Sequence, residues 1–275
     1  MPDPMPVLLT IAGSDSGGGA GLQADLKTAE ALGVFGTSAV TAVTAQNTRG
    51  VTAVEVLPAA AVRAQIDAVA GDFAVGATKL GMLATAEIAR AVADAVRAHR
   101  LRPLVVDPVM VATSGDLLLE RDAVDAYRER LLPLATVLTP NTHEAQALTG
   151  VVVETLADAR AAAAELRAMG AAAVLVKGGH LDGEADAVDL LLDADGERLY
   201  RARRLDTTST HGTGCTLASA IAAHLALGLG LRDAVGRAKA YLTEALRRAP
   251  GLGGGHGPVR HLWTLDGAAV SSIGS

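Results

Sequence analysis

Short apolar runs rich in Val and Leu recur along the chain and alternate with longer Ala-rich stretches. The runs are continuous rather than alternating, which is typical of strands buried on both faces of a sheet. They are Val7 to Ala12, Ser38 to Ala45, Ala77 to Met82, Leu104 to Val109, Ala135 to Thr139, Ala173 to Val176 and Ala187 to Leu192. Stretches with helical periodicity include Ala59 to Val69, Ala86 to Ala98, Leu156 to Met169 and Thr216 to Leu227. This alternation predicts an α/β fold with one open, mainly parallel sheet covered by helices.

The chain of 275 residues is long enough for one large α/β domain or for two average domains. No boundary has the composition of a linker, so we expect a single domain over residues 1–265. The segment from Asp193 to Glu197 predicts a hairpin turn, and so an antiparallel piece late in the sheet. The run Gly251 to Gly257 is expected to be a loop, and residues 266–275 a disordered tail.

Composition excludes several classes of partner and location. The net charge of -6 argues against binding to nucleic acid or to an anionic membrane surface. No apolar stretch approaches the roughly 18 residues that a membrane span needs. The single cysteine excludes an intrachain disulfide, and the N-terminus lacks the basic and apolar regions of a signal peptide. A cytoplasmic location is therefore expected.

Polar and glycine-rich residues follow the predicted strands. In open parallel sheets, ligands bind beyond the carboxyl ends of the strands. The residues there are Gly13-Ser14-Asp15, Gln46-Asn47-Thr48, Gly81-Met82-Leu83, Asp107-Pro108, Asn141 with Glu144, and Lys177-Gly178-Gly179-His180. A plain hydrophobic core does not require this clustering, so we expect a ligand site at this edge.

The segment His211 to Thr216 leads into an apolar helix. Gly212, Thr213, Gly214 and Cys215 would occupy the helix N-terminus, where free backbone N–H groups and the helix dipole favour an anion. Such a site suits the charge that develops on a transferring phosphoryl group. The alternative is a tight turn with a threonine cap, as many helices have.

Cys215 is the only cysteine, and lone cysteines are commonly buried and inert. At a helix N-terminus its thiol would have a lowered pKa and could act as a base toward a substrate hydroxyl. A Cys–His hydrolase, with His211 or His180 as the partner, is the competing chemistry. Nothing else in the chain supplies acyl-transfer machinery.

A glycine-rich segment, Gly13 to Gly21, follows the first predicted strand and opens a helix. Residues 19–24 fit the dinucleotide pattern G-x-G-x-x-G/A, but the fit starts six residues after the strand ends. The second strand also ends in Gln46 rather than in an acid for the ribose. The phosphate loop G-x-x-x-x-G-K-[ST] is absent, because none of the four lysines follows a glycine. A loop that lets a flat ligand approach the backbone is the better interpretation.

Other strand ends carry charged or amide side chains. Asp107 and Glu144 could hold Mg²⁺ through water, as phosphoryl transfer requires, although Asn141 and Glu144 would equally form a helix capping box. Lys177 offers a point charge for a phosphate, or is a solvated lysine. The amide of Gln46 presents a donor and an acceptor that match an aminopyrimidine edge, or is a satisfied loop amide.

Together these motifs resemble the hydroxymethylpyrimidine/phosphomethylpyrimidine kinases of thiamin biosynthesis, in the ribokinase-like superfamily. The resemblance runs from about Val7 to His261. It rests on the segments 12–21, 44–48, 79–83, 107–110, 139–141 with Glu144, 177–180, 210–216 and 256–259 with His261. It implies a three-layer ribokinase-like fold, a homodimer, and ATP- and Mg²⁺-dependent phosphorylation of 4-amino-5-hydroxymethyl-2-methylpyrimidine and then of its monophosphate.

The resemblance also implies roles for individual residues. Cys215 takes the place of the aspartate base of sugar kinases in the superfamily, and Gly212, Thr213 and Gly214 form the anion hole. The implied substrate-binding residues are Gln46, Gly13, Met82, Val109 and Asp25. Asn141, Lys177 and Thr210 would bind the nucleotide, and Asp107 and Glu144 the metal. Two rival hypotheses remain: a pyridoxal kinase on the same scaffold, and a non-catalytic sensor of the pyrimidine.

Overall fold

The computed structural model describes residues 5–110, 123–179 and 181–266. Within these residues nine strands form one sheet in the order β3-β2-β1-β4-β5-β6-β7-β8-β9. The strands are β1 Val7–Asp15, β2 Phe35–Asn47, β3 Gly50–Val56, β4 Val75–Leu80, β5 Leu104–Val106, β6 Val137–Leu138, β7 Val174–Gly178, β8 Asp186–Asp193 and β9 Gly196–Arg203. The six strands from β2 to β7 in this order pair in parallel, whereas β3, β8 and β9 are antiparallel additions at the two edges.

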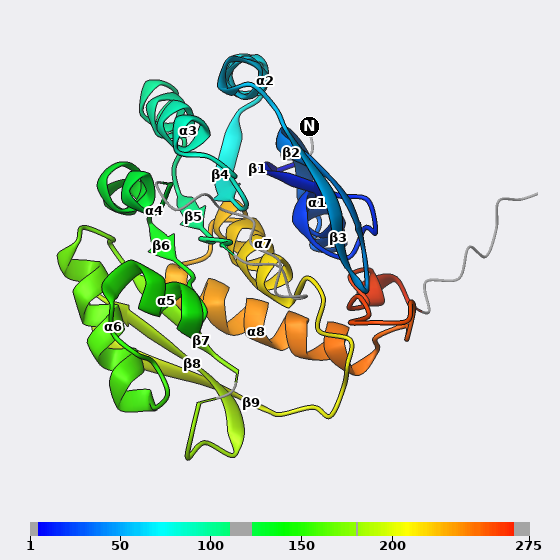
Figure 1. The fold of residues 1–275 in the computed structure, drawn as a ribbon, viewed down its shortest axis with the longest axis vertical. Coiled ribbons are helices and arrows are strands. Elements are labelled where there is room, and N and C mark those ends of the chain that lie inside the picture. The colour runs from blue at the N-terminus through cyan, green and yellow to red at the C-terminus, as the bar shows by residue number, and fades with distance from the viewer. Residues whose placement is uncertain (1–4, 111–122, 180, 267–275) are drawn as a thin grey trace, which may run out of the picture.

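Helices cover both faces of the sheet and make three layers (Figure 1). The α-helices are α1 Gly21–Ala31, α2 Ala59–Asp72, α3 Ala86–Ala98, α4 Ala123–Ala126, α5 Thr142–Thr149, α6 Leu156–Ala168, α7 Thr213–Ala226 and α8 Leu231–Arg247. One core lies under α2 to α6, and the other lies under α1, α7 and α8. The α/β prediction is therefore confirmed.

Each of the seven apolar runs overlaps a strand, and the hairpin prediction is confirmed by the pairing of Asp193 with Gly196. The runs overestimated β5 and β6, which are only three and two residues long. The sequence analysis did not identify β3, because this edge strand buries none of its side chains and so lacks an apolar run. It also did not name α8, whose buried residues are mostly alanine.

The register of the parallel strands brings polar residues to one edge of the sheet. Backbone pairing continues past the end of β6 as a bridge between Asn141 and Lys177 of β7. A second bridge joins His211 to Pro258, so the segment before α7 lies beside the glycine-rich C-terminal loop. Of the expected tail, all but residue 266 lies outside the described residues.

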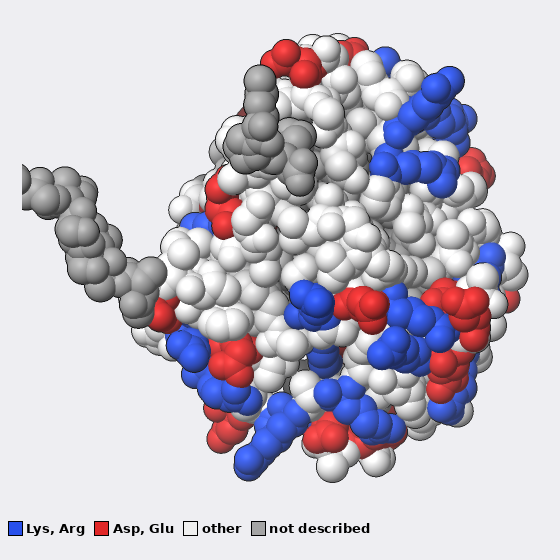
Figure 2. Space-filling view, turned by 180° about the vertical axis from the view of Figure 1, so that it is seen from behind, with Lys and Arg blue, Asp and Glu red and all other residues white. Residues whose placement is uncertain are grey.

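The surface carries mixed charge. Figure 2 shows lysine and arginine side chains interspersed with aspartate and glutamate over much of one face. Ion pairs between such groups include Arg160–Glu197 and Arg232–Asp193. Among the described helices, none combines the length and apolar character needed to cross a membrane.

Candidate active site

Gly212 ends the segment before α7 and serves as its N-cap, in the left-handed conformation with φ of +79°. A Cβ at this position would lie 1.8 Å from the carbonyl oxygen of Gly19, so only glycine fits. The threonine-cap alternative is wrong, because the Thr213 hydroxyl donates to the carbonyl of Thr210 instead. The first turn of α7 thus begins without a side-chain cap. The Thr213 N–H donates to the Thr210 carbonyl, and the N–H groups of the next residues in this turn are the ones suited to an anion.

Lys177 and Asp107 lie beside this helix terminus. A Cβ on Gly214 would be 3.2 Å from Lys177 Nζ and 3.8 Å from Asp107 Oδ2. Lys177 Nζ donates to Asp107 Oδ1 at 2.7 Å and lies 3.7 Å from Glu144 Oε2. Both carboxylates are buried. The structure therefore brings together the ammonium group, two carboxylates and the helix N-terminus that the sequence analysis had named separately.

Asn141 and Glu144 form the capping box of α5. The Asn141 side chain accepts from the Glu144 N–H at 2.8 Å, and Glu144 Oε2 accepts from the Asn141 N–H at 2.7 Å. Burial raises the pKa of Glu144 to about 7, and the Asp107 charge adds to this against the opposing effect of Lys177. The capping role is confirmed, and one oxygen of Glu144 also faces the ammonium group.

Three of the expected substrate-binding residues gather at a second point of the same edge. A Cβ on Gly13 would lie 2.8 Å from Met82 Cε, so the thioether packs directly on the glycine backbone. Met82 also packs in a small apolar cluster with Ala42, Ala84 and the half-buried Val109. This arrangement provides an apolar surface for one face of a flat ring.

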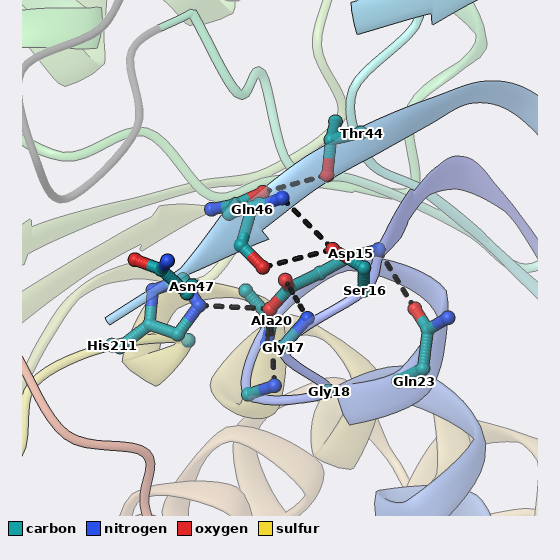
Figure 3. Close-up of polar contacts among 12 residues, drawn as sticks. Asp15, Ser16, Gly17, Gly18, Ala20, Gln23, Thr44, Gln46, Asn47 and His211 are labelled. Atoms are coloured by element: carbon teal, nitrogen blue, oxygen red, sulfur yellow. Dashed lines mark hydrogen bonds and ion pairs between the residues drawn. The ribbon is translucent and has the colours of Figure 1, made fainter. Parts of the chain in front are cut away.

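Gln46 lies at the end of β2, beside the loop that follows β1 (Figure 3). Its Oε1 accepts from Thr44 Oγ1 at 3.0 Å, and its backbone exchanges hydrogen bonds with Ser16. The half-buried amide is thus held in a fixed orientation but not sealed from solvent. This geometry is compatible with recognition of a polar ring edge.

The loop after β1 is held by one carboxylate that the sequence analysis gave no role. Asp15 accepts from the backbone N–H groups of Gly17, Gly19 and Ala20, and its Oδ2 lies 2.8 Å from His211 Nε2 (Figure 3). Although burial alone would raise the pKa of Asp15, these hydrogen bonds lower it below its ordinary value. The acid inside a glycine-rich run was the available signal. Asp15 joins this loop to the residue before Gly212.

Cys215 lies at the third position of α7, half-buried. The expectation of a lowered thiol pKa is wrong: burial raises the pKa to about 11, even though the Lys79 ammonium and the Gly21 N–H oppose this. The helix terminus alone does not outweigh the loss of hydration. For the rival Cys–His hydrolase, His211 is engaged with Asp15, and His180 lies outside the described residues.

Two further expectations concern Asp25 and Thr210. Asp25 does not line the site, because its side chain is fully buried and accepts hydrogen bonds from Thr10, Ser219 and Lys79. Its assignment as a substrate-binding residue is therefore corrected. Thr210 is half-buried at the entry to α7, with its hydroxyl 3.3 Å from His256 Nδ1. Its carbonyl accepts from the backbone N–H and the hydroxyl of Thr213, so Thr210 and Lys177 both lie beside the first turn of α7.

Comparison with known proteins identifies the family. Residues 15–260 match the family model described as phosphomethylpyrimidine kinase. The hydroxymethylpyrimidine/phosphomethylpyrimidine kinase of Rhizobium meliloti is 56% identical over 94% of this chain and 99% of its own length.

Two solved structures resemble the chain. The phosphomethylpyrimidine kinase of Clostridium difficile superposes with a TM-score of 0.78 at 44% identity, covering 87% of this chain and 99% of that one. The ADP complex of Bacillus subtilis pyridoxal kinase has a TM-score of 0.87 at 38% identity, covering 94% and 98%. The chain therefore has a ribokinase-like fold and belongs to the phosphomethylpyrimidine kinase family.

Proposed function

We propose that this chain is an ATP-dependent kinase that phosphorylates 4-amino-5-hydroxymethyl-2-methylpyrimidine and then its monophosphate, in thiamin biosynthesis. The observation that carries the proposal is the meeting of the α7 N-terminus with Lys177, Asp107 and Glu144 at the sheet edge that also holds Gly13, Met82 and Gln46. One half of this edge suits phosphates, and the other half suits a flat polar ring.

The acceptor binds at the half formed by β1, β2 and β4. The pyrimidine ring lies against Gly13, Met82 and Val109, and the Gln46 amide pairs with its polar edge. Because Thr44 holds the Gln46 amide in place before the ring binds, the amide accepts the ring in one orientation. We therefore assign to Gln46 the discrimination of the aminopyrimidine.

The transferring phosphoryl group lies at the α7 N-terminus. The backbone of residues 212–214 faces its equatorial oxygens, and Lys177 neutralises charge on the donor phosphates, with Asn141 and Thr210 on the nucleotide side. In the first phosphorylation the hydroxyl oxygen of the acceptor forms the new bond to phosphorus, the bond from that phosphorus to the oxygen that leaves with ADP breaks, and the hydroxyl proton passes to the thiolate form of Cys215. In the second phosphorylation a phosphate oxygen of the monophosphate forms the new bond instead, and no hydroxyl proton is transferred.

A magnesium ion fits the carboxylate pair. Asp107 and Glu144 share the single ammonium of Lys177, so two buried carboxylates have one cation between them. In the described residues no three His, Cys, Asp or Glu side chains cluster as a metal cage. Mg²⁺ commonly needs only one or two carboxylates beside water and substrate phosphates. When bound there, it would neutralise developing charge on the phosphates.

The second candidate function is pyridoxal phosphorylation. It is favoured by the 38% identity and near-complete superposition with the Bacillus subtilis pyridoxal kinase. Pyridoxal is also a flat heterocycle with a hydroxymethyl group, so the same edge could receive it.

The test is ADP release with hydroxymethylpyrimidine, its monophosphate and pyridoxal measured side by side. The proposal expects turnover with both pyrimidines and a lower kcat/KM for pyridoxal. Cys215→Ala should lower kcat by at least about 10²-fold, and Gln46→Leu should mainly raise KM for the pyrimidine. Absence of ADP with either pyrimidine would favour a non-catalytic sensor, and near-full turnover of Cys215→Ala would remove the base assignment. The homodimer and the cytoplasmic location stay predictions.

A further inference from the structure

A buried ionic cluster lies below the site, and the proposed reaction gives it no role. Lys79 Nζ, on β4, is 2.8 Å from both carboxylate oxygens of Asp25, and both side chains are 0% exposed. Thr10 Oγ1 donates to Asp25 Oδ2 at 2.6 Å, and Ser219 Oγ donates to Oδ1 at 2.5 Å. Burying two charges is expensive, and such a pair seldom stabilises more than well-packed apolar residues would. Stability alone is therefore a weak reason for this cluster.

The cluster lies about one helical turn from the thiol of Cys215. Cys215 and Ser219 are four residues apart on α7, so their side chains lie on the same face, about 6 Å apart along the axis. Gly21 and Asp25 have the same spacing on α1, which packs against α7. The Gly21 N–H faces the thiol, and Asp25 faces Ser219. The two pairs therefore meet across one helix–helix contact.

The ammonium of Lys79 also reaches the floor of the site. A Cβ on Gly81, the first residue after β4, would lie 3.0 Å from Lys79 Nζ and 2.9 Å from Ala12 Cβ. Glycine at this position lets the ammonium approach the backbone that directly follows β4, at the sheet edge where the substrates bind. The positive charge is thus close to the reacting groups, yet sealed from solvent.

We propose that Lys79, held by Asp25, Thr10 and Ser219, is a positioning residue that acts through Cys215: its fixed, buried positive charge favours the thiolate that then accepts the proton of the acceptor hydroxyl. The proposal rests on the assignment of Cys215 as the base. Asp25, with its hydrogen bonds, keeps the ammonium in place and protonated.

The charges around the thiol agree with this role. Burial raises the pKa of Cys215, Lys79 is the strongest opposing influence, and Asp25 and Asp107 raise it further. The remaining charge that interacts with it is Lys177, whose own pKa the thiolate raises. Although burial would lower the pKa of Lys79, Asp25, Cys215 and Asp107 together hold it above its ordinary value. The ammonium therefore stays charged at any pH at which the enzyme is folded and active.

The test uses the fact that Cys215 is the only cysteine, so alkylation of the intact protein reports on this thiol alone. We would measure the rate of modification by iodoacetamide at pH 8.5 in Lys79→Met and in the charge-neutral double variant Lys79→Met with Asp25→Asn. A nearby opposite charge shifts a pKa by about 1–3 units, so Lys79→Met should react at least about tenfold more slowly. The double variant should also react more slowly, by a smaller factor.

Matched controls separate charge from loosened packing. Lys239→Met breaks a comparable ion pair, with Asp189 at 2.7 Å, in β8 and α8, and should react like the parent. Ser219→Ala removes a hydrogen bond to Asp25 without changing charge, and should slow alkylation less than Lys79→Met does. Loosened packing would expose the thiol and speed alkylation, which is opposite to the expected change. In 6 M guanidinium all variants should react at one rate.

Parent-like or faster alkylation of both the single and the double Lys79 variants would overturn the proposal. If the single variant does not fold, the double variant alone decides. The base assignment is tested separately by turnover of Cys215→Ala. If Cys215→Ala keeps full turnover and the Lys79 variants alkylate slowly, the charge acts on the thiol but the thiol does not serve the reaction. If Cys215→Ala loses turnover and the Lys79 variants alkylate like the parent, the base assignment stands and Lys79 has no part in the reaction.

Discussion

Two lysines lie in parallel strands of the sheet, Lys79 in β4 and Lys177 in β7, and they differ in how their charge is used. Lys79 gives its ammonium to one carboxylate, Asp25, with both oxygens at 2.8 Å and no exposure. Lys177 is 14% exposed and is shared unequally, at 2.7 Å from Asp107 and 3.7 Å from Glu144. The first charge is saturated and fixed, whereas the second has room for another anion. The same residue type therefore serves as a static field in one place and as a phosphate ligand in the other.

The glycine beside each lysine follows the same division. The missing Cβ of Gly81 would meet Ala12 Cβ as well as Lys79, so the space is closed by packing. The missing Cβ of Gly214 would meet only the mobile end of Lys177 and, at 3.8 Å, Asp107. Closed packing fixes a charge, and open space beside a helix N-terminus admits a ligand.

The largest expected effect is on turnover in Lys177→Met. Loss of a charge that faces the transferring phosphoryl group should lower kcat/KM by about 10²–10³-fold, because a single preorganised donor is commonly worth that much. Stability should fall less than in Lys79→Met, because Glu144, whose pKa is already raised to about 7, can take up a proton when the ammonium is lost. ADP release and thermal unfolding measure the two quantities, and Lys239→Met is the control. A loss of only a few-fold would mean that Lys177 is a structural lysine like Lys79.

In Lys79→Met, unlike Lys177→Met, we expect a large decrease in the free energy of unfolding. Removing one partner of a buried pair leaves Asp25 uncompensated, which costs about 3–5 kcal/mol. Adding Asp25→Asn should recover much of that loss, because no isolated charge then remains buried. Urea denaturation of the single and double variants measures this difference. Equal stabilities of the two variants would show that the cost of Lys79→Met does not come from the unpaired charge of Asp25.

The sequence could predict this comparison only in part. The apolar runs located the strand ends, and through them Lys177, Asp107 and Asn141, because carboxyl ends of parallel strands share an edge. Lys79 lies inside an apolar run rather than after it, so the strand-end rule passes over it. Its partner Asp25 is distant in sequence, and only the pairing of Thr10 with Lys79 across β1 and β4 places the cluster.

The energetics of the site were also beyond the sequence. A helix N-terminus predicted a low thiol pKa for Cys215, but the sign depends on burial, which is a property of the packed structure. The edge strand β3 was missed because none of its side chains is buried. The Asp15–His211 pair was missed because its two residues are distant in sequence. Motifs indicated which groups meet, and packing determined their charge state.

A smaller effect is expected from adding a methyl group at each glycine. Gly81→Ala should cost about 1–3 kcal/mol of stability, because the new Cβ meets Ala12 and a lysine that cannot move. Gly214→Ala should be nearly neutral in stability, since Lys177 can swing away, but it should reduce turnover by displacing that ammonium. Urea unfolding and ADP release of the two variants check this pair. The reversed pattern, with Gly214→Ala the less stable, would contradict the distinction between closed and open space.

The smallest effect is expected from removing one hydroxyl beside the carboxylate partner of each lysine. Ser219→Ala removes a donor to Asp25 and should lower the free energy of unfolding by about 1 kcal/mol, the usual net value of a hydrogen bond. Thr139→Val removes the 3.1 Å bond to Asp107 and should instead appear in KM for ATP, because it frees the carboxylate that shares Lys177. The two readouts, unfolding and nucleotide KM, are measured on both variants. A change in nucleotide KM for Ser219→Ala would mean that the buried cluster is coupled to the phosphate side, and that the two lysines act as one network rather than as separate charges.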